Sequence, residues 1–196
     1  MIIENLESYR VYLEFIQKID RLFDDIYSQY SDKMHCDKQC FECCKNLVSI
    51  SFIEGLHLQE GIKNLDKQTL QAIRKNLQEI KSLDVKKLSE DQKPFCPLLI
   101  NGICAVYDHR PVICRCFGAP LADDVTGEVR TCPKNFPDMR EKDYTFRAIS
   151  TRMLSTQTVL LTQYLLKETG KDISDDYIPP LTSIVEVLEY STGENL

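Results

Sequence analysis

The chain has 196 residues, of which 43% are hydrophobic and 28% are charged, and these ordinary values argue against a disordered protein. Its net charge of -6 provides no basic face, so neither nucleic acid nor an anionic membrane surface is expected as a partner. No apolar run approaches the roughly 20 residues of a membrane-spanning helix, and the acidic start differs from a secretory signal. We therefore expect a cytoplasmic protein.

Hydrophobic periodicity predicts a helical scaffold. Apolar residues recur every three or four positions over residues 6–30, which is typical of a long helix, at about 5–31, that buries one face. Ser51 and Glu54 match a capping box that opens a second helix. Asp66 is placed to cap a third.

The other end of the chain predicts a further long helix at about 140–169, which Gly170 would close. The region between the terminal helices contains two irregular, cysteine-rich inserts, one of them with a short β-hairpin. We therefore expect a mainly α protein with a single helical domain over 1–196, in which residues 34–133 form the metal-binding region.

The nine cysteines are unevenly distributed, since eight fall within 36–44 and 96–116 and the ninth, Cys132, follows closely. Disulfides are rare in a reducing cytoplasm, and an odd number leaves at least one thiol unpaired. Packing alone does not need so many thiols in so short a span, because aliphatic side chains fill space without their reactivity. The distribution favours metal binding.

The first cluster lies in MHCDKQCFECCK, residues 34–45, and contains Cys36, Cys40, Cys43 and Cys44. On a helix these positions share one face, and in a loop the short spacers still bring the thiols together. Several thiolates side by side require a compensating cation, which a bound metal supplies. The neighbours Cys43 and Cys44 are expected to point in different directions, so that one ligates here and the other serves a second site or the core.

The second cluster lies in FCPLLINGICAVYDHRPVICRCFG, residues 95–118. Asn101 and Gly102 predict a tight hairpin turn, because both tolerate a positive φ. The hairpin would return Cys104 toward Cys96 at its base, and a proline fixes the backbone three residues before Cys114. Thiols on such a constrained backbone suit a metal site.

The combination of Cys-x3-Cys-x2-Cys-Cys with the later CPLL and GICAVYDHRPVICR resembles the YkgJ-type cysteine-cluster family, a zinc- or iron-chelating domain with the pattern CxxCxxCC. The resemblance also covers a strand-then-helix continuation in VSISFIEGLHL. It implies eight metal ligands: Cys36, Cys40, Cys43, Cys44, Cys96, Cys104, Cys114 and Cys132. The chain departs from the family pattern in its three-residue first spacer and in Cys116, which is extra.

The choice of metal rests on the resemblance and on the spacing of the histidines. The three-residue spacer is similar to that of the flagellin lysine N-methylases, whose related cluster is an iron–sulfur centre, and the histidines lack zinc-ligand spacing. A [4Fe-4S] cluster is therefore favoured, with Zn²⁺ as the alternative, and either one site or two sites of four cysteines fit the count. Only His35 is retained as a further candidate ligand, because His57 is expected to be packed or solvated and His109 to lie on the surface.

We expect a metal-binding protein with a role in electron transfer, redox sensing or metal handling. Two alternatives are a zinc-binding structural or interaction module and a cluster-dependent enzyme related to the protein N-methylases. The spacing of Cys36, Cys40 and Cys43 also occurs in radical S-adenosylmethionine enzymes, but here it follows a long helix and no alternating strand–helix pattern accompanies it. No catalytic constellation is recognisable, so enzyme status stays open. The partner expected is a metal ion or cluster, and the sequence identifies no protein partner.

Overall fold

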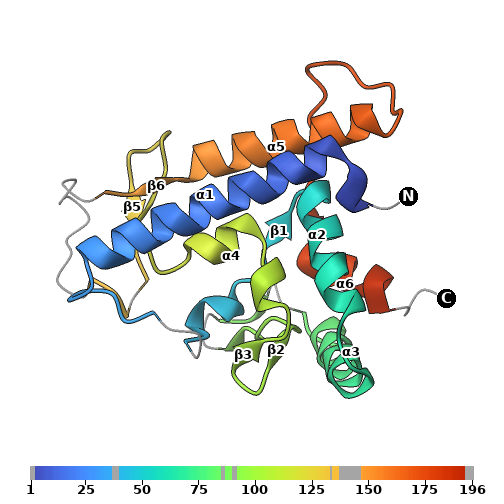
Figure 1. Ribbon diagram of the computed structural model, residues 1–196. Helices are drawn as coiled ribbons and strands as arrows, with labels where there is room; N and C mark the ends of the chain where they lie inside the picture. Colours follow the sequence, from blue (N-terminus) through green and yellow to red (C-terminus); the bar gives the residue numbers. More distant parts are fainter. Residues whose placement is uncertain are drawn as a thin grey trace. The chain divides into compact units, whose positions relative to one another are not determined.

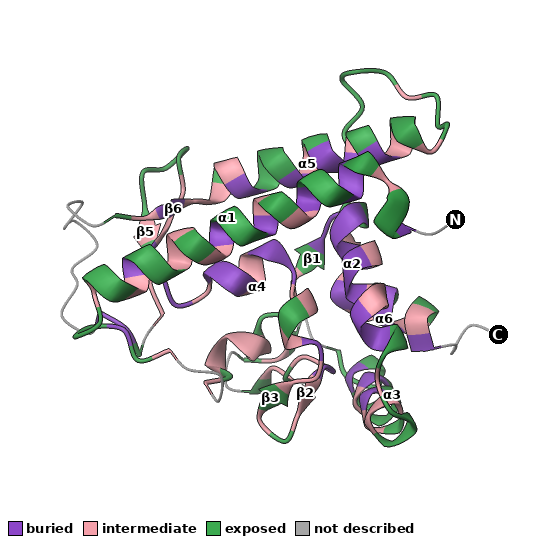
Figure 2. Cartoon of the chain, in the orientation of Figure 1, coloured by how far each residue is buried: buried purple, intermediate pink, exposed green. Residues whose placement is uncertain are grey.

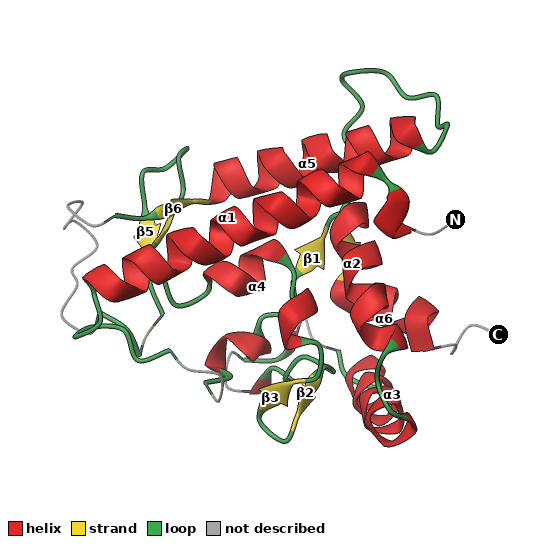
Figure 3. Ribbon diagram, viewed as in Figure 1, coloured by secondary structure: helices red, strands yellow, loops and turns green. Residues whose placement is uncertain are grey.

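The computed structural model describes residues 3–36, 40–84, 87–89, 92–132, 134–136 and 147–192, and these residues are mainly helical, as predicted (Figure 3). They contain six α-helices, and all the strands are two residues long. The chain forms two compact units. Unit 1 joins residues 1–37 to 111–180, and unit 2 joins 38–110 to 181–196. Each unit is thus built from stretches that are distant in sequence, and the single domain over 1–196 stays a prediction.

Unit 1 contains the first long helix, α1 (Glu7–Gln29), which agrees with the predicted range of about 5–31. A short 3-10 helix, η1 (Ile3–Asn5), precedes it. The buried residues of α1 recur at helical spacing along the stripe that the sequence predicts (Figure 2). They include Tyr9, Tyr12, Ile16, Ile19 and Ile26.

Helix α5 (Thr151–Glu168) runs alongside α1 (Figure 1). It begins later than the predicted position 140. Residues 140–146 lie outside the described part of the chain, and Ser150, whose hydroxyl accepts the N–H of Met153 at 2.9 Å, caps the helix. Gly170 takes the positive φ of 81° that closes the helix as predicted.

The end of α5 is tied to the start of α1. The two carboxylate oxygens of Glu168 accept the backbone N–H groups of Glu7 and Ser8 at 2.8 and 2.9 Å. These N–H groups have no partner within α1, because the first turn of a helix leaves its donors unsatisfied. Glu168 therefore acts as a cap supplied by another helix and joins the two ends of unit 1.

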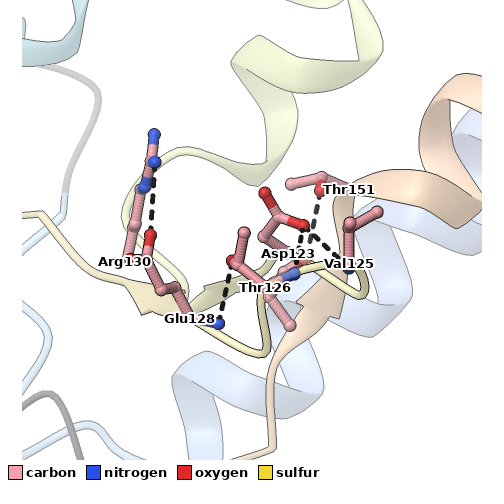
Figure 4. A network of polar contacts seen from close by, with 7 residues as sticks. Asp123, Val125, Thr126, Glu128, Arg130 and Thr151 are labelled. Carbon is pink, nitrogen blue, oxygen red and sulfur yellow. Dashed lines mark hydrogen bonds and ion pairs between the residues drawn. The ribbon is translucent and has the colours of Figure 1, made fainter.

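A small sheet of three strands completes unit 1, in the order β5 (Val129–Arg130), β4 (Leu121–Ala122) and β6 (Ile149–Ser150). The β4–β5 turn is organised by side chains, as Figure 4 shows. The Asp123 carboxylate accepts the N–H groups of Val125 at 2.8 Å and Thr126 at 3.2 Å, and these bonds lower the pKa of Asp123. Thr151 donates to the Ala122 carbonyl at 3.0 Å, which fixes the start of α5 to the sheet.

Unit 2 is built on α2 (Phe52–Lys63), α3 (Lys67–Lys81) and α6 (Ile184–Thr192). Strand β1 (Ser49–Ile50) pairs with β7 (Thr182–Ser183), and thereby holds the C-terminal stretch against the rest of the unit. The core residues of unit 2 come from both stretches of the chain. They are Ile50, Leu58, Ile62, Ile73, Leu77, Leu98, Val106, Ile184, Val187 and Leu188.

Both predicted caps of unit 2 are confirmed. Glu54 accepts the backbone N–H of Ser51 at 2.8 Å and its hydroxyl at 2.7 Å, as in a capping box. Asp66 accepts the N–H of Thr69 at 2.9 Å and begins α3. Among the described residues, no helix combines the length and apolar composition that crossing a membrane requires.

Candidate metal centre

The two cysteine clusters meet at their backbones in unit 2. Cys43 and Cys44 lie on a short 3-10 helix, η2 (Glu42–Lys45). The N–H of Cys96, from the second cluster, donates to the carbonyl of Cys44 at 2.7 Å. This bond joins two segments that are about fifty residues apart in sequence, so the end of the first cluster and the start of the second occupy one region of unit 2.

The predicted hairpin brings Cys104 back to the same region. Strand β2 (Leu99–Ile100) pairs with β3 (Ile103–Cys104), so that Leu99 lies opposite Cys104. The turn residues Asn101 and Gly102 have φ values of 52° and 78°, as a tight I′-type turn requires. Cys96 lies at the base of this hairpin, where its carbonyl accepts the N–H of Leu99 at 3.0 Å.

Aromatic rings flank the hairpin. The rings of Phe41 and Phe95 meet edge to face with centroids 5.6 Å apart. A side chain at Gly102 would contact Phe41, whose ring lies 3.5 Å from the position of a Cβ atom there. The positive φ of the turn is therefore the reason for a glycine here, since a Cβ atom would only make an ordinary contact with the ring.

The electrostatics of the thiols show how closely they are grouped. A hydrogen bond with Cys44 is the largest cause that raises the pKa of Cys43, followed by burial. Burial raises the pKa of Cys96 to about 12, with added contributions from the charges of Cys104 and Cys43. Burial also raises the pKa of Cys104. Without a cation, the four thiols of this group disfavour one another's ionised form.

Two features of this group bear on earlier expectations. Cys44 raises the pKa of Cys43 through a hydrogen bond and through its charge, so the two neighbouring thiols influence each other, and the expectation that only one of them ligates here stays a prediction. Arg110 supplies a positive charge that opposes the rise in pKa at both Cys43 and Cys104, while its guanidinium stacks 3.6 Å above the Tyr107 ring. Tyr107 belongs to a 3-10 helix, η5 (Tyr107–His109).

The eight predicted ligands are divided between the two units. Unit 2 contains Cys40, Cys43, Cys44, Cys96 and Cys104, whereas unit 1 contains Cys36, Cys114 and Cys132. None of the nine cysteines, all of which lie in the described part of the chain, forms a disulfide, and the eight predicted ligands are partly exposed. The ninth, Cys116, is fully buried at 0% exposure, as suits a core residue outside the ligand set.

The donor set fits a thiophilic metal in its chemistry. Unit 2 groups soft thiol donors beside a cation that offsets the charge of thiolates. Among the described residues, no group of three or more His, Cys, Asp or Glu side chains is arranged so that it could hold a metal ion. The thiols would therefore have to exchange their mutual hydrogen bonding for metal bonds and turn toward a shared centre.

Unit 1 holds its cysteines differently. Cys114 and Cys116 lie on a short helix, α4 (Val112–Cys116), whose buried Arg115 donates to both carboxylate oxygens of Asp20 on α1. The Cys36 thiol lies beside Gly118 and accepts a hydrogen bond from Asn135 at 3.1 Å. Sequence reasoning missed Asn135, whose only signal is its position three residues after Cys132.

Two of the three histidines occupy packed positions. His57 is buried on α2, and its ring lies 4.7 Å from that of His109. Gly61 leaves room for His109, because a Cβ atom there would be 2.7 Å from the ring. The packed alternative for His57 is therefore confirmed, whereas His109 is partly buried against α2 rather than fully on the surface. His35 is exposed, and its backbone N–H donates to Asn135 at 2.9 Å.

Comparison with known families assigns the cysteine-rich part of the chain. A family model described as "CxxCxxCC: Putative zinc- or iron-chelating domain" matches residues 35–133, which contain all nine cysteines. The chain belongs to the CxxCxxCC family. Its cysteine cluster is thereby assigned to a family of metal-chelating domains, whose description covers both zinc and iron. No curated protein and no solved structure matches the chain.

Proposed function

We propose that this CxxCxxCC chain is a metal-binding protein whose clustered cysteines hold a [4Fe-4S] centre that serves in electron transfer or redox sensing. The observation that carries the proposal is the grouping of Cys43, Cys44, Cys96 and Cys104 in unit 2. A [4Fe-4S] cluster takes four cysteine thiolates, and this group of four supplies that number; Cys40, nearby in sequence, is a fifth candidate in unit 2.

The residues around the thiols suit a centre of this charge. Arg110 favours the ionised form of Cys43 and Cys104, which is the form that binds metal. The Phe41 ring lies beside the hairpin turn and meets the Phe95 ring edge to face. A bound cluster supplies one-electron exchange. The environment of the sulfurs then sets how readily the electron is accepted.

Unit 1 contains the other three proposed ligands, Cys36, Cys114 and Cys132. The zinc-binding module remains the second candidate, because the description of the family names zinc alongside iron. Both metals accept all-cysteine coordination, so the ligand types alone favour neither.

The test is metal analysis of the protein purified without oxygen. The [4Fe-4S] proposal predicts a brown protein that contains iron and sulfide and bleaches on reduction. We expect Cys104→Ser to lower the iron and sulfide content, whereas Cys116→Ser, a matched buried thiol outside the ligand set, retains both. Colourless protein with stoichiometric zinc would decide for the zinc module, and equal losses in the two variants would refute the ligand assignment.

A further inference from the structure

A buried asparagine in unit 1 makes three side-chain hydrogen bonds at one point. Asn135, which is only 1% exposed, donates through Nδ2 to Sγ of Cys36 at 3.1 Å and to the Gly118 carbonyl at 2.7 Å. Its Oδ1 accepts the backbone N–H of His35 at 2.9 Å. The side chain therefore joins the segment after α1 to the segment after α4.

These partners determine which way the amide faces. The Gly118 carbonyl can only accept a hydrogen bond and the His35 backbone N–H can only donate one, so the amide nitrogen must face Gly118 and the oxygen must face His35. The group directed at Cys36 is consequently an N–H donor. A donor at this distance fixes the position of the sulfur relative to the buried amide.

Gly118 holds the same thiol from the other side. Its φ is 106°, and a Cβ atom at this position would lie only 2.3 Å from Sγ of Cys36. Any side chain would therefore displace the sulfur, whatever its effect on the backbone. The thiol of Cys36 is placed by a close approach that glycine alone permits and by a hydrogen bond from a side chain that is itself fixed.

The asparagine is anchored by its own backbone. Its N–H donates to the Cys132 carbonyl at 2.9 Å. The next residue, Phe136, donates its N–H to the Lys33 carbonyl at 3.0 Å and packs its ring edge-on against Tyr30 at 5.5 Å. The loop that carries Cys132 and the segment that carries Cys36 are thus held at a defined separation within unit 1.

We propose that Asn135 is a positioning residue for Cys36, which orients the thiol as a metal ligand within unit 1. The inference rests on the proposed function, since it assigns Asn135 a role toward the metal that Cys36 would bind. Partners of this kind orient ligands and tune the metal, and their loss typically lowers metal affinity about 10-fold to 100-fold.

The experiment measures the reactivity of each thiol in the full chain after reconstitution with ferrous iron and sulfide. Iodoacetamide labels thiols that no metal protects, and mass spectrometry assigns the label to individual cysteines. We compare wild type with Asn135→Ala, Gly118→Ala and Gly127→Ala. Gly127 is the matched control, because it also has a positive φ, 73°, but no atom lies within 4 Å of its Cβ position.

The proposal predicts that Cys36 is protected in wild type and in Gly127→Ala, and that it is labelled about 10-fold faster or more in the other two variants. Cys116, which is fully buried in the same unit, reports on folding and should stay unlabelled throughout. Labelling of Cys36 and Cys116 together would instead show that Asn135 only stabilises the fold. Because Gly118→Ala adds a single methyl group, it tests the placement of the thiol even if Asn135→Ala unfolds.

Continued protection of Cys36 in both variants would overturn the inference. Labelling of Cys36 in reconstituted wild type, while Cys43 and Cys104 stay protected, would also overturn it but would leave the proposed function standing. If no cysteine is protected in wild type, the proposed function fails, and the inference fails with it.

Discussion

The substitution Leu98→Ala tests whether the stability of unit 2 can be lowered without loss of its metal. Leu98 is 2% exposed and belongs to the core of unit 2, against which Cys96 and Cys104 also pack. A buried Leu→Ala substitution removes apolar contacts and leaves a cavity, at a cost of about 2–5 kcal/mol of unfolding free energy. The cavity would open directly beside two of the proposed ligands.

The size of the loss in unfolding free energy determines how much metal the variant should retain. If the chain starts at the low end of the usual stability, about 5 kcal/mol, a loss of about 3 kcal/mol leaves about 2 kcal/mol and roughly 97% of the molecules folded at room temperature. The apparent metal affinity falls only by the folded fraction, so binding should be nearly unchanged. We therefore expect Leu98→Ala to lower the stability and to retain the metal.

The assay is urea unfolding of the metal-depleted protein, followed by far-ultraviolet circular dichroism, together with metal analysis of the protein purified without oxygen. Cys104→Ser is the counterpart, because it removes a proposed ligand and little apolar volume from the core. It should lose metal without a comparable shift of the unfolding midpoint. Loss of metal from Leu98→Ala at unchanged stability, or an unchanged midpoint, would refute the reasoning.

Three further perturbations test other parts of the structure. Arg110→Met should weaken metal binding about tenfold in chelator competition, because it removes the charge that favours thiolates; unchanged affinity would rule out that role. Asp20→Ala should lower the free energy of unfolding by about 1–3 kcal/mol, because it leaves the buried Arg115 guanidinium without its carboxylate. The control is Asp24→Ala at an exposed position, and an equal effect of the two substitutions would contradict this expectation. The lowered pKa of Asp123 means that its contribution to stability is fully present above the ordinary carboxyl pKa of about 3.9 and is lost as pH falls through the folded value. Acid unfolding should show this loss in wild type and not in Asp123→Asn, and identical acid limbs would refute it.

The sequence by itself determined the local structure. The capping box at Ser51, the cap at Asp66 and the turn at Asn101 and Gly102 were all predicted and are all present. Each depends on side chains and backbone within a few residues of one another, so the local sequence contains the whole physical cause. The buried apolar face of α1 was predictable for the same reason, because the spacing of its residues is contained in one continuous segment.

Membership of the CxxCxxCC family could also be inferred from the sequence, because the spacing of the cysteines is a local pattern. The late start of α5 could not be inferred from the sequence, because Ile149 and Ser150 form strand β6, which pairs with β4. Such pairing depends on residues that lie well before them in the chain, and no periodicity within the segment reports it.

The tertiary structure alone decided how the thiols are grouped. Cys36 and Cys40 belong to one sequence motif but to different units, whereas Cys44 and Cys96, far apart in the chain, share a backbone hydrogen bond. The roles of Asn135 and Gly118 at Cys36 were equally invisible, because neither residue belongs to a recognisable ligand pattern. Cysteines that are far apart in sequence come together when their segments bury apolar faces in one core. A motif of a few residues does not identify the distant segment that will pack beside it.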